Sequence, residues 1–83
     1  MNKKPLVRAI VAAMIFLEES SSDEVDPDAA VRGMESIAHE LLKFAEVDRF
    51  KFIELVEVVA SDSLDEHEAR FIRNIPQMIG LVE

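Results

Sequence analysis

The sequence of 83 residues contains no cysteine, and it has only two glycines and two histidines. The lack of cysteine excludes disulfides, cysteine-ligated zinc, iron–sulfur clusters and thiol nucleophiles. The two glycines, Gly33 and Gly80, are too far apart to form a glycine-rich phosphate loop, which needs at least two glycines close together. Two histidines supply few ligands for a metalloenzyme, and no cofactor is expected.

Basic residues are also scarce, since nine Lys and Arg stand against 17 Asp and Glu and the formal net charge is −8. Nucleic acids and anionic membranes are bound through basic patches, so this balance argues against both classes of partner. Apolar residues make up 49% of the chain, which is enough to predict a folded protein. The length predicts a single domain, residues 1–83, with a thin core.

The spacing of apolar residues predicts an all-α fold, a compact four-helix bundle. The predicted helices span residues 5–19, 27–45, 48–61 and 64–74. An apolar tail, residues 76–82, follows the last helix. We expect this tail to fold back over the bundle, and the alternative is an apolar patch that marks a homodimer or a partner groove.

The first predicted helix is apolar on every side, because Arg8 is the only polar residue from Leu6 to Leu17. Such a helix is typical of the centre of a core or of a membrane segment. Its apolar run of twelve residues reaches only ~18 Å, too short for a bilayer core of ~30 Å. An export signal with Lys3 and Lys4 in its basic region is the alternative, but no small-residue cleavage site follows. The prediction is therefore a central core helix in a cytoplasmic protein.

Capping residues mark the expected starts of the second and third helices. Asp26 stands before Pro27, and this pair predicts an N-cap followed by a proline in the first helical position. Asp48 is expected to cap the third helix, with Val47 and Phe52 in contact as a hydrophobic staple.

The fourth helix has a start signal and a stop signal. Ser63 to Glu66 match the capping box S-x-x-E, which predicts a helix that starts at Leu64 and buries that side chain. Pro76 disfavours helical backbone at the preceding residue, so the helix is expected to end near residue 74.

The motifs of metal sites and of catalysis are incomplete. His39 begins the pattern H-E-x-x-H, but Lys43 stands where the second zinc ligand belongs. Neither histidine follows a glutamate by three residues, as a helical di-iron site requires. Without the pattern G-x-S-x-G, no serine is placed as an activated nucleophile, and we expect no enzymatic activity. A metal site at His39 and His67 remains a minor hypothesis beside a surface ion pair between Glu35 and His39.

The acidic residues are concentrated in one stretch. Residues 18–28 hold six acids and no base, so this stretch alone carries a charge of −6. Like charges at close range destabilise a fold, and they speed the encounter with a cationic partner, so the stretch is either solvated surface or a binding face. A calcium loop is a third interpretation, but the EF-hand spacing and its glycine are missing. With two smaller acidic groups, the candidate partner-binding residues are Glu18, Glu19, Asp23, Glu24, Asp26, Asp28, Glu54, Glu57, Asp65, Glu66 and Glu68.

Small size, lack of cysteine, strong acidity, four short helices and the lack of a catalytic motif together form a profile. It resembles that of the small acidic helical immunity proteins of bacterial toxin systems. The resemblance implies a protein that neutralises a cognate toxin, commonly a basic nuclease, by covering its active site or substrate-binding face. The alternative function is a homodimeric structural or accessory protein, joined through the apolar tail.

Overall fold

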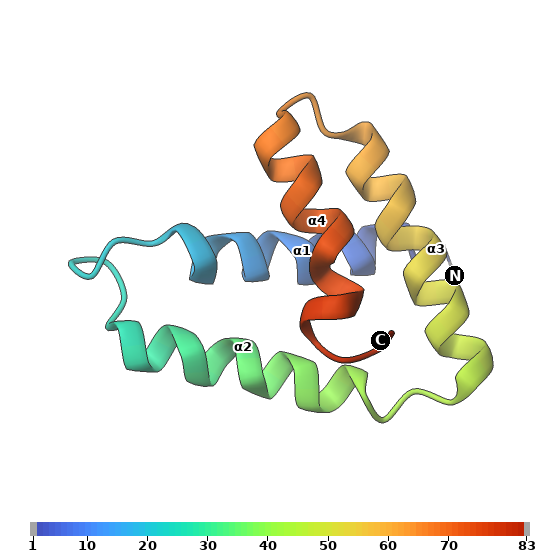
Figure 1. The fold of residues 1–83 in the computed structure, drawn as a ribbon, viewed down its shortest axis with the longest axis horizontal. Helices are drawn as coiled ribbons and strands as arrows, with labels where there is room; N and C mark the ends of the chain where they lie inside the picture. The colour runs from blue at the N-terminus through green and yellow to red at the C-terminus, as the bar shows by residue number, and fades with distance from the viewer. Residues whose placement is uncertain (1, 83) are drawn as a thin grey trace.

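The computed structural model describes residues 2–82, and this part of the chain forms four helices and no strand. The helices are α1 (Lys4–Glu19), α2 (Pro27–Leu41), α3 (Glu46–Asp62) and α4 (Glu66–Met78). Figure 1 shows α1 and α2 as one hairpin and α3 and α4 as a second hairpin. The predicted all-α, four-helix fold is confirmed.

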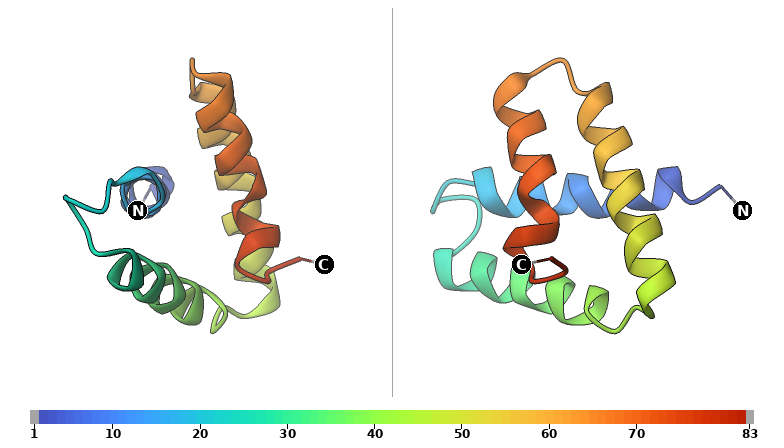
Figure 2. Two further views of the ribbon diagram at one scale, coloured as in Figure 1. Left: turned by 60° about the vertical axis from the view of Figure 1, so that its left-hand side comes forward. Right: turned by 45° about the vertical axis from the view of Figure 1, so that its right-hand side comes forward.

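The two hairpins cross each other steeply (Figures 1 and 2). The most extensive contacts are those between α3 and α4, followed by those of α1 with α3 and of α1 with α2. The hairpin of α3 and α4 therefore packs across one side of α1, while α2 runs along another side. The α1–α2 loop and the α3–α4 loop lie at different ends of the molecule.

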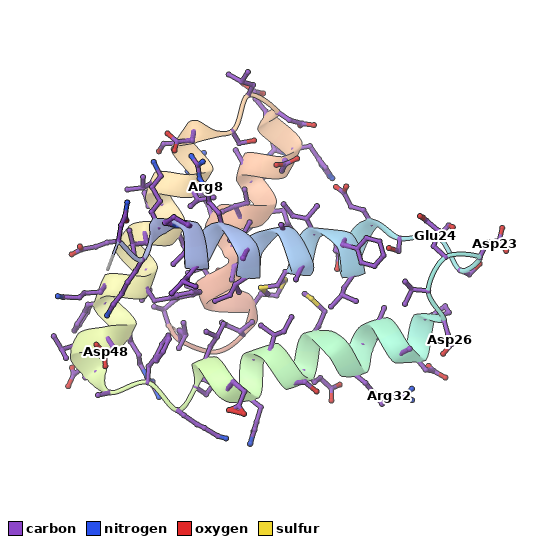
Figure 3. All side chains as sticks on the ribbon, turned by 180° about the vertical axis from the view of Figure 1, so that it is seen from behind. Arg8, Asp23, Glu24, Asp26, Arg32 and Asp48 are labelled. Carbon is purple, nitrogen blue, oxygen red and sulfur yellow. The ribbon has the colours of Figure 1, made fainter. Side chains whose placement is uncertain are left out.

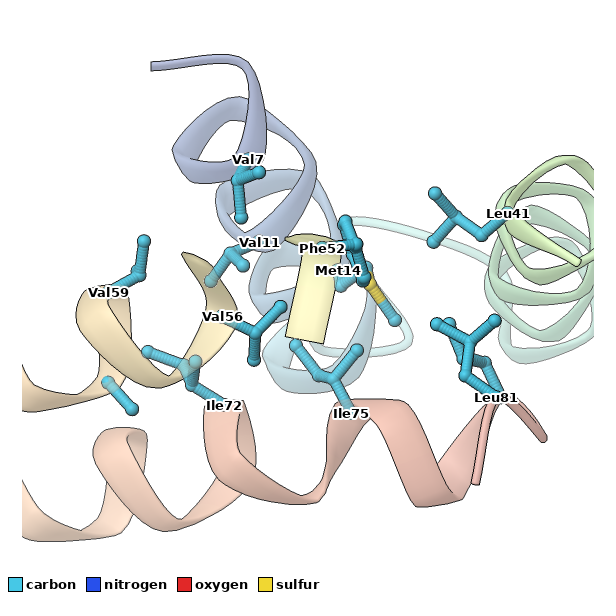
Figure 4. Packing of buried hydrophobic residues seen from close by; sticks show 12 residues of the cluster. Val7, Val11, Met14, Leu41, Phe52, Val56, Val59, Ile72, Ile75 and Leu81 are labelled. Carbon is cyan, nitrogen blue, oxygen red and sulfur yellow. The ribbon is translucent and has the colours of Figure 1, made fainter. Parts of the chain in front are cut away.

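One apolar cluster holds the hairpins together (Figure 4). Met14 of α1 and Ile75 of α4 are fully buried, and Val56 of α3 is 1% exposed. Three helices thus contribute to the same centre, which accounts for most of the stabilisation that burial provides. The other members of the cluster are Val7, Val11, Leu41, Phe52, Val59, Ala60, Ile72, Ile79 and Leu81.

Helix α1 enters this core on one side only. Its buried residues are Val7, Val11 and Met14, which repeat at helical spacing. The opposite side is exposed, and Phe16 keeps 53% of its surface accessible. The prediction of a helix at the centre of the core is therefore wrong, because α2 and the α3–α4 hairpin together cover only part of its circumference.

Helix α2 begins as predicted and ends earlier than predicted. The Asp26 carboxylate accepts a hydrogen bond from the Ala29 amide at 3.1 Å, and Pro27 occupies the first turn. The helix ends at Leu41 rather than at residue 45, and the Arg49 side chain of α3 reaches back to this end. Its guanidinium donates to carbonyl oxygens of residues 42 and 44, at 2.8 and 3.2 Å, which satisfies acceptors that the end of a helix leaves free.

Helix α3 begins two residues before the predicted cap. The Ala45 carbonyl accepts hydrogen bonds from the amides of Asp48 and Arg49, so Ala45 takes the N-cap position without a side-chain cap. Val47 is 62% exposed, and the predicted staple with Phe52 is wrong. Glu46 and Asp48 instead lie in the first turn, where the helix dipole favours acids.

Helix α4 is capped by Asp65 and not by Ser63. The Asp65 carboxylate accepts from the amides of His67 at 2.9 Å and Glu68 at 3.3 Å. Ser63 is the C-cap of α3, and its backbone amide donates to the Ala60 carbonyl at the end of that helix. Leu64 lies in the tight connection between the helices and is fully exposed, so its predicted burial is wrong.

The predicted end of α4 at residue 74 is also wrong, because the helix continues through Pro76 to Met78. Pro76 is buried in the last turn of the helix. Proline has no backbone N–H, so only one carbonyl of the preceding turn loses its helical hydrogen bond. Gly80 follows the C-cap Ile79, and its φ of +85° is the left-handed conformation that glycine adopts readily. The amide of Leu81 donates to the Pro76 carbonyl at 2.8 Å, and that of Gly80 donates to the Gln77 carbonyl at 3.2 Å. This pair of bonds is a Schellman motif.

The apolar tail is split between helix and turn. Residues 76–78 complete α4, while Ile79 and Leu81 are buried in the apolar cluster. The expectation that the tail folds back over the bundle is confirmed for these two side chains. Buried in the chain's own core, they are not free to form the contact of a dimer.

Candidate protein-binding surface

The acids of residues 18–28 lie together at one end of the molecule, which we call the acidic end. It consists of the last turn of α1, the loop and the first turn of α2, and its six acids are all exposed: Glu18, Glu19, Asp23, Glu24, Asp26 and Asp28. Figure 3 shows Asp23, Glu24 and Asp26 at the turn that joins the two helices. The hairpin thus gathers into one place acids that the sequence only made neighbours along the chain.

Two of these acids also hold the loop in shape. Glu24 accepts from the amide of Ser21 at 3.2 Å and from its hydroxyl at 3.4 Å, and Asp26 caps α2. The amides of Glu24 and Val25 both donate to the Ser21 carbonyl at 3.0 Å. The loop is therefore a hydrogen-bonded turn in which two of the six carboxylates, those of Glu24 and Asp26, are held in place.

The acidic end has no cationic partner within the described residues 2–82. The ion pairs within residues 2–82 are Lys4–Asp62, Arg8–Asp62, Lys43–Glu40 and Arg73–Glu57. None of them includes an acid of residues 18–28. No ion pair within residues 2–82 therefore offsets the negative charge of the acidic end, which is exposed to a basic surface.

The remaining candidate acids lie elsewhere. Glu57 of α3 accepts from the Arg73 guanidinium of α4 at 3.1 Å, a contact that joins the two helices. Asp65 is committed to its cap, with Glu66 and Glu68 beside it in the first turn of α4. Glu54 is exposed on α3. The structure does not bring these acids together with the acidic end, because the α3–α4 loop lies at a different end of the molecule (Figure 1).

Two carboxyl groups have shifted pKa values, and both lie outside the acidic end. Hydrogen bonds from Lys4 and Arg8 hold the pKa of Asp62 below its ordinary value. A hydrogen bond from Lys43, at 2.7 Å, lowers the pKa of Glu40 in the same way. Both groups are stabilised in the charged form, which suits surface ion pairs and not proton transfer at neutral pH.

Among the residues that the structure describes, the two histidines belong to no group that could hold a metal ion. His39 of α2 and His67 of α4 are both exposed. Over residues 2–82, no three side chains of His, Asp and Glu are grouped so that they could hold a metal ion. Glu35 and His39 do not form the expected ion pair, and the pair on this part of α2 is the one between Glu40 and Lys43.

An apolar groove of about 290 Å³ lies between α1 and α3, and the sequence analysis did not predict it. Leu6 and Ile10 form one wall, Phe44, Phe52 and Leu55 form the other, and the two phenylalanine rings pack 5.8 Å apart. Its polar lining residues are Lys3, Asp48 and Lys51. The sequence carries no local pattern that predicts this groove, because its two walls become neighbours only where the hairpins cross.

None of the helices described for residues 2–82 is long and apolar enough to cross a membrane. No protein-family model matches the chain, and neither a curated protein nor a solved structure matches it. A function for this chain must therefore be inferred from its own charge and geometry.

Proposed function

We propose that this chain is a non-catalytic, cytoplasmic protein-binding module that neutralises a basic toxin, with a nuclease as the most fitting class. The observation that carries the proposal is the acidic end, where six exposed acids share one hydrogen-bonded turn and form no ion pair with residues 2–82. A nuclease binds phosphates through a basic surface, and an acidic protein that covers this surface competes with the nucleic acid.

The proposed mechanism is occlusion. Long-range attraction speeds the encounter, and the ordered turn then meets the basic surface without first having to lose conformational freedom. Val31, which is 54% exposed near the start of α2, supplies an apolar contact beside the charges. Such a complex weakens as salt rises, because salt screens the attraction between exposed charges.

The test uses two charge-reversal variants with the same net charge. Residues of the acidic end that do not cap or brace the loop are reversed in E18K/D23K, and exposed acids of α3 and α4 are reversed in E54K/E66K. The basic partner is first captured from lysate of the source organism, eluted with salt and identified by mass spectrometry. Association rates are then measured with the purified partner, and its nuclease activity is assayed with and without this protein.

We expect E18K/D23K to lower the association rate at least about tenfold at low salt, and E54K/E66K to lower it much less. Wild-type protein should also inhibit the partner's cleavage of nucleic acid in proportion to the complex formed. Equal losses for the two variants would show that net charge matters and not the acidic end. A tight complex without inhibition would contradict the role in neutralisation.

A further inference from the structure

The outer face of α1 is an apolar surface that the rest of the described chain leaves bare. Figure 2 shows the hairpin of α3 and α4 on one side of α1 and α2 on another, with no element over the remaining side. Leu6 and Phe16 of this face are 50% and 53% exposed. The exposed apolar residues recur at spacings that form one stripe along the helix: Pro5, Ala9, Ala12, Ala13 and Phe16, with Leu6 at its edge, where it also lines the groove between α1 and α3. A continuous apolar stripe of three turns is the kind of surface that marks an interaction site.

The charges along α1 run opposite to its dipole. The N-terminal end carries Lys3, Lys4 and Arg8, and the C-terminal end carries Glu18 and Glu19. No acid lies in the first turn and no base lies in the last turn, although the dipole favours that arrangement. Asp62 of α3 pairs with Lys4 and Arg8 at the basic end. The order of charges along α1 also matches a second α1 that runs in the opposite direction.

We propose that the outer face of α1 binds the same face of a second copy of this chain, as an antiparallel pair of helices about a two-fold axis. Antiparallel pairing sets the basic end of each helix beside the acidic end of the other, and it opposes the two helix dipoles favourably. A two-fold interface needs a surface that is complementary to itself, and this face is complementary to itself in charge.

The spacing of the residues defines where the helices cross. With the axis at Ala12 and Ala13, Phe16 of each copy lies over Ala9 of the other, so that a large side chain meets a small one. Arg8 and Glu19 are eleven residues apart, close to three turns, and lie along the same edge of the stripe. In the pair, Arg8 of one copy reaches Glu19 of the other. Arg8 retains free donors for this contact, since one guanidinium nitrogen, Nη2, binds Asp62.

A second copy fits this face better than a membrane does. The net charge of −8 and the acids at the end of α1 oppose approach to an anionic bilayer. A single pair of helices covers less than the ~800 Å² per partner of a standard interface, so we expect a weak dimer that forms only at high protein concentration. The inference shares Glu19 with the acidic end of the proposed function, whereas Phe16 and the axis lie outside residues 18–28, so a variant at Phe16 tests the dimer separately.

The first test measures mass against concentration by sedimentation velocity, from low micromolar to millimolar protein. We expect a shift from the monomer of 9.4 kDa towards twice that mass, with F16E weakening the dimer at least about tenfold. The control V47E changes an apolar residue of α3 that is even more exposed than Phe16, and it should leave the dimer unchanged. A monomer throughout, or a dimer that F16E leaves intact, would overturn the proposal, as would binding to anionic vesicles in place of dimerisation.

Cysteine cross-linking tests the antiparallel geometry, because the chain has no cysteine of its own. Residue 12 lies beside the axis, so A12C should form a disulfide between copies, whereas A9C should not, because the two copies of residue 9 are too far apart for one. A parallel pair would cross-link both variants, and cross-linking of the fully exposed control L64C at the same rate would show random collision. Either result overturns the proposed pairing.

A charge swap gives the complementary evidence. R8E and E19R should each weaken their own dimer several-fold, because each places like charges opposite one another. A mixture of the two variants should restore dimerisation, since both contacts of the mixed pair then join opposite charges. Circular dichroism checks that each variant keeps its helices. If the mixture dimerised no more strongly than either variant alone, the contact between Arg8 and Glu19 would be contradicted.

Discussion

At the scale of single residues, polar groups decide where each helix of this protein begins and ends. Asp65 takes the cap of α4 because Ser63 is already engaged at the end of α3. Arg49 closes the end of α2 from a neighbouring helix, at a point where no local side chain does so. Each of these contacts satisfies backbone groups that a helix end leaves without partners.

Gly80 is the residue whose backbone conformation is the most restrictive. Its φ of +85° is needed for the Schellman motif, and an added Cβ would meet only a Leu42 carbon at 3.9 Å, an ordinary contact. The cost of replacing it is therefore conformational. We expect G80A to lower the free energy of unfolding by about 1 kcal/mol, measured by urea denaturation.

Asparagine supplies the control at the same position, because it tolerates the left-handed conformation better than alanine. G80N should retain part of the stability that G80A loses. If the two variants lost the same amount, steric effects of the side chain would be responsible instead of backbone conformation.

At the scale of helices, ion pairs join elements that are distant in the sequence. Asp62, at the end of α3, accepts from both Lys4 and Arg8 of α1 at 2.8 Å. Arg73 of α4 binds Glu57 of α3. Gly33 brings α2 close to α1, since a Cβ there would lie 3.0 Å from a Leu17 methyl group. Ion pairs between helices and the close approach at Gly33 thus position the helices in addition to the apolar core.

The lowered pKa of Asp62 gives the stability a pH dependence. The folded chain releases this proton more readily than the unfolded chain does, so the ion pairs stabilise the fold fully above the ordinary pKa of an aspartate. The stabilisation is lost as pH falls through the lowered pKa. We expect thermal melts of D62N to depend less on acid pH than those of wild type.

The effect on melting temperature should be small, because exposed ion pairs contribute little to stability. D23N serves as the control, since Asp23 forms no ion pair with residues 2–82. If D23N and D62N flattened the pH dependence equally, the cause would be the overall negative charge and not the contact with Lys4 and Arg8.

At the scale of the whole molecule, one small core makes the two hairpins a single cooperative unit. Ile75 is fully buried where α1, α3 and α4 meet, so its loss affects both hairpins. We expect I75V to lower the free energy of unfolding by about 1 kcal/mol, through lost burial and the small cavity left behind. Denaturation by urea, followed by circular dichroism, measures this change.

The whole protein should still unfold in one transition, because the core is shared. V31A removes apolar atoms from a residue that is 54% exposed, and we expect a change below about 0.5 kcal/mol. Two separate transitions in I75V would indicate that the hairpins are stable independently, contrary to the packing described.

Local patterns in the sequence are enough to establish the class of fold and the place of the acids. Periodic apolar residues and the Asp26–Pro27 signal are local features, and they predict four helices and the start of α2 correctly. The concentration of acids in residues 18–28 can be read directly from the sequence, because formal charge is a property of composition. It makes the acidic stretch a candidate site, and its role in binding stays a prediction.

The use that the fold makes of each helix depends on tertiary packing instead. The sequence of α1 is apolar on every side, and which side remains exposed depends on where α2 and the α3–α4 hairpin cross it. The continuation of α4 through Pro76 likewise accompanies the burial of Ile75, Pro76 and Ile79, which local propensity does not include. Burial energy depends on contacts between residues distant along the chain, and a local pattern carries no information about which of those contacts form.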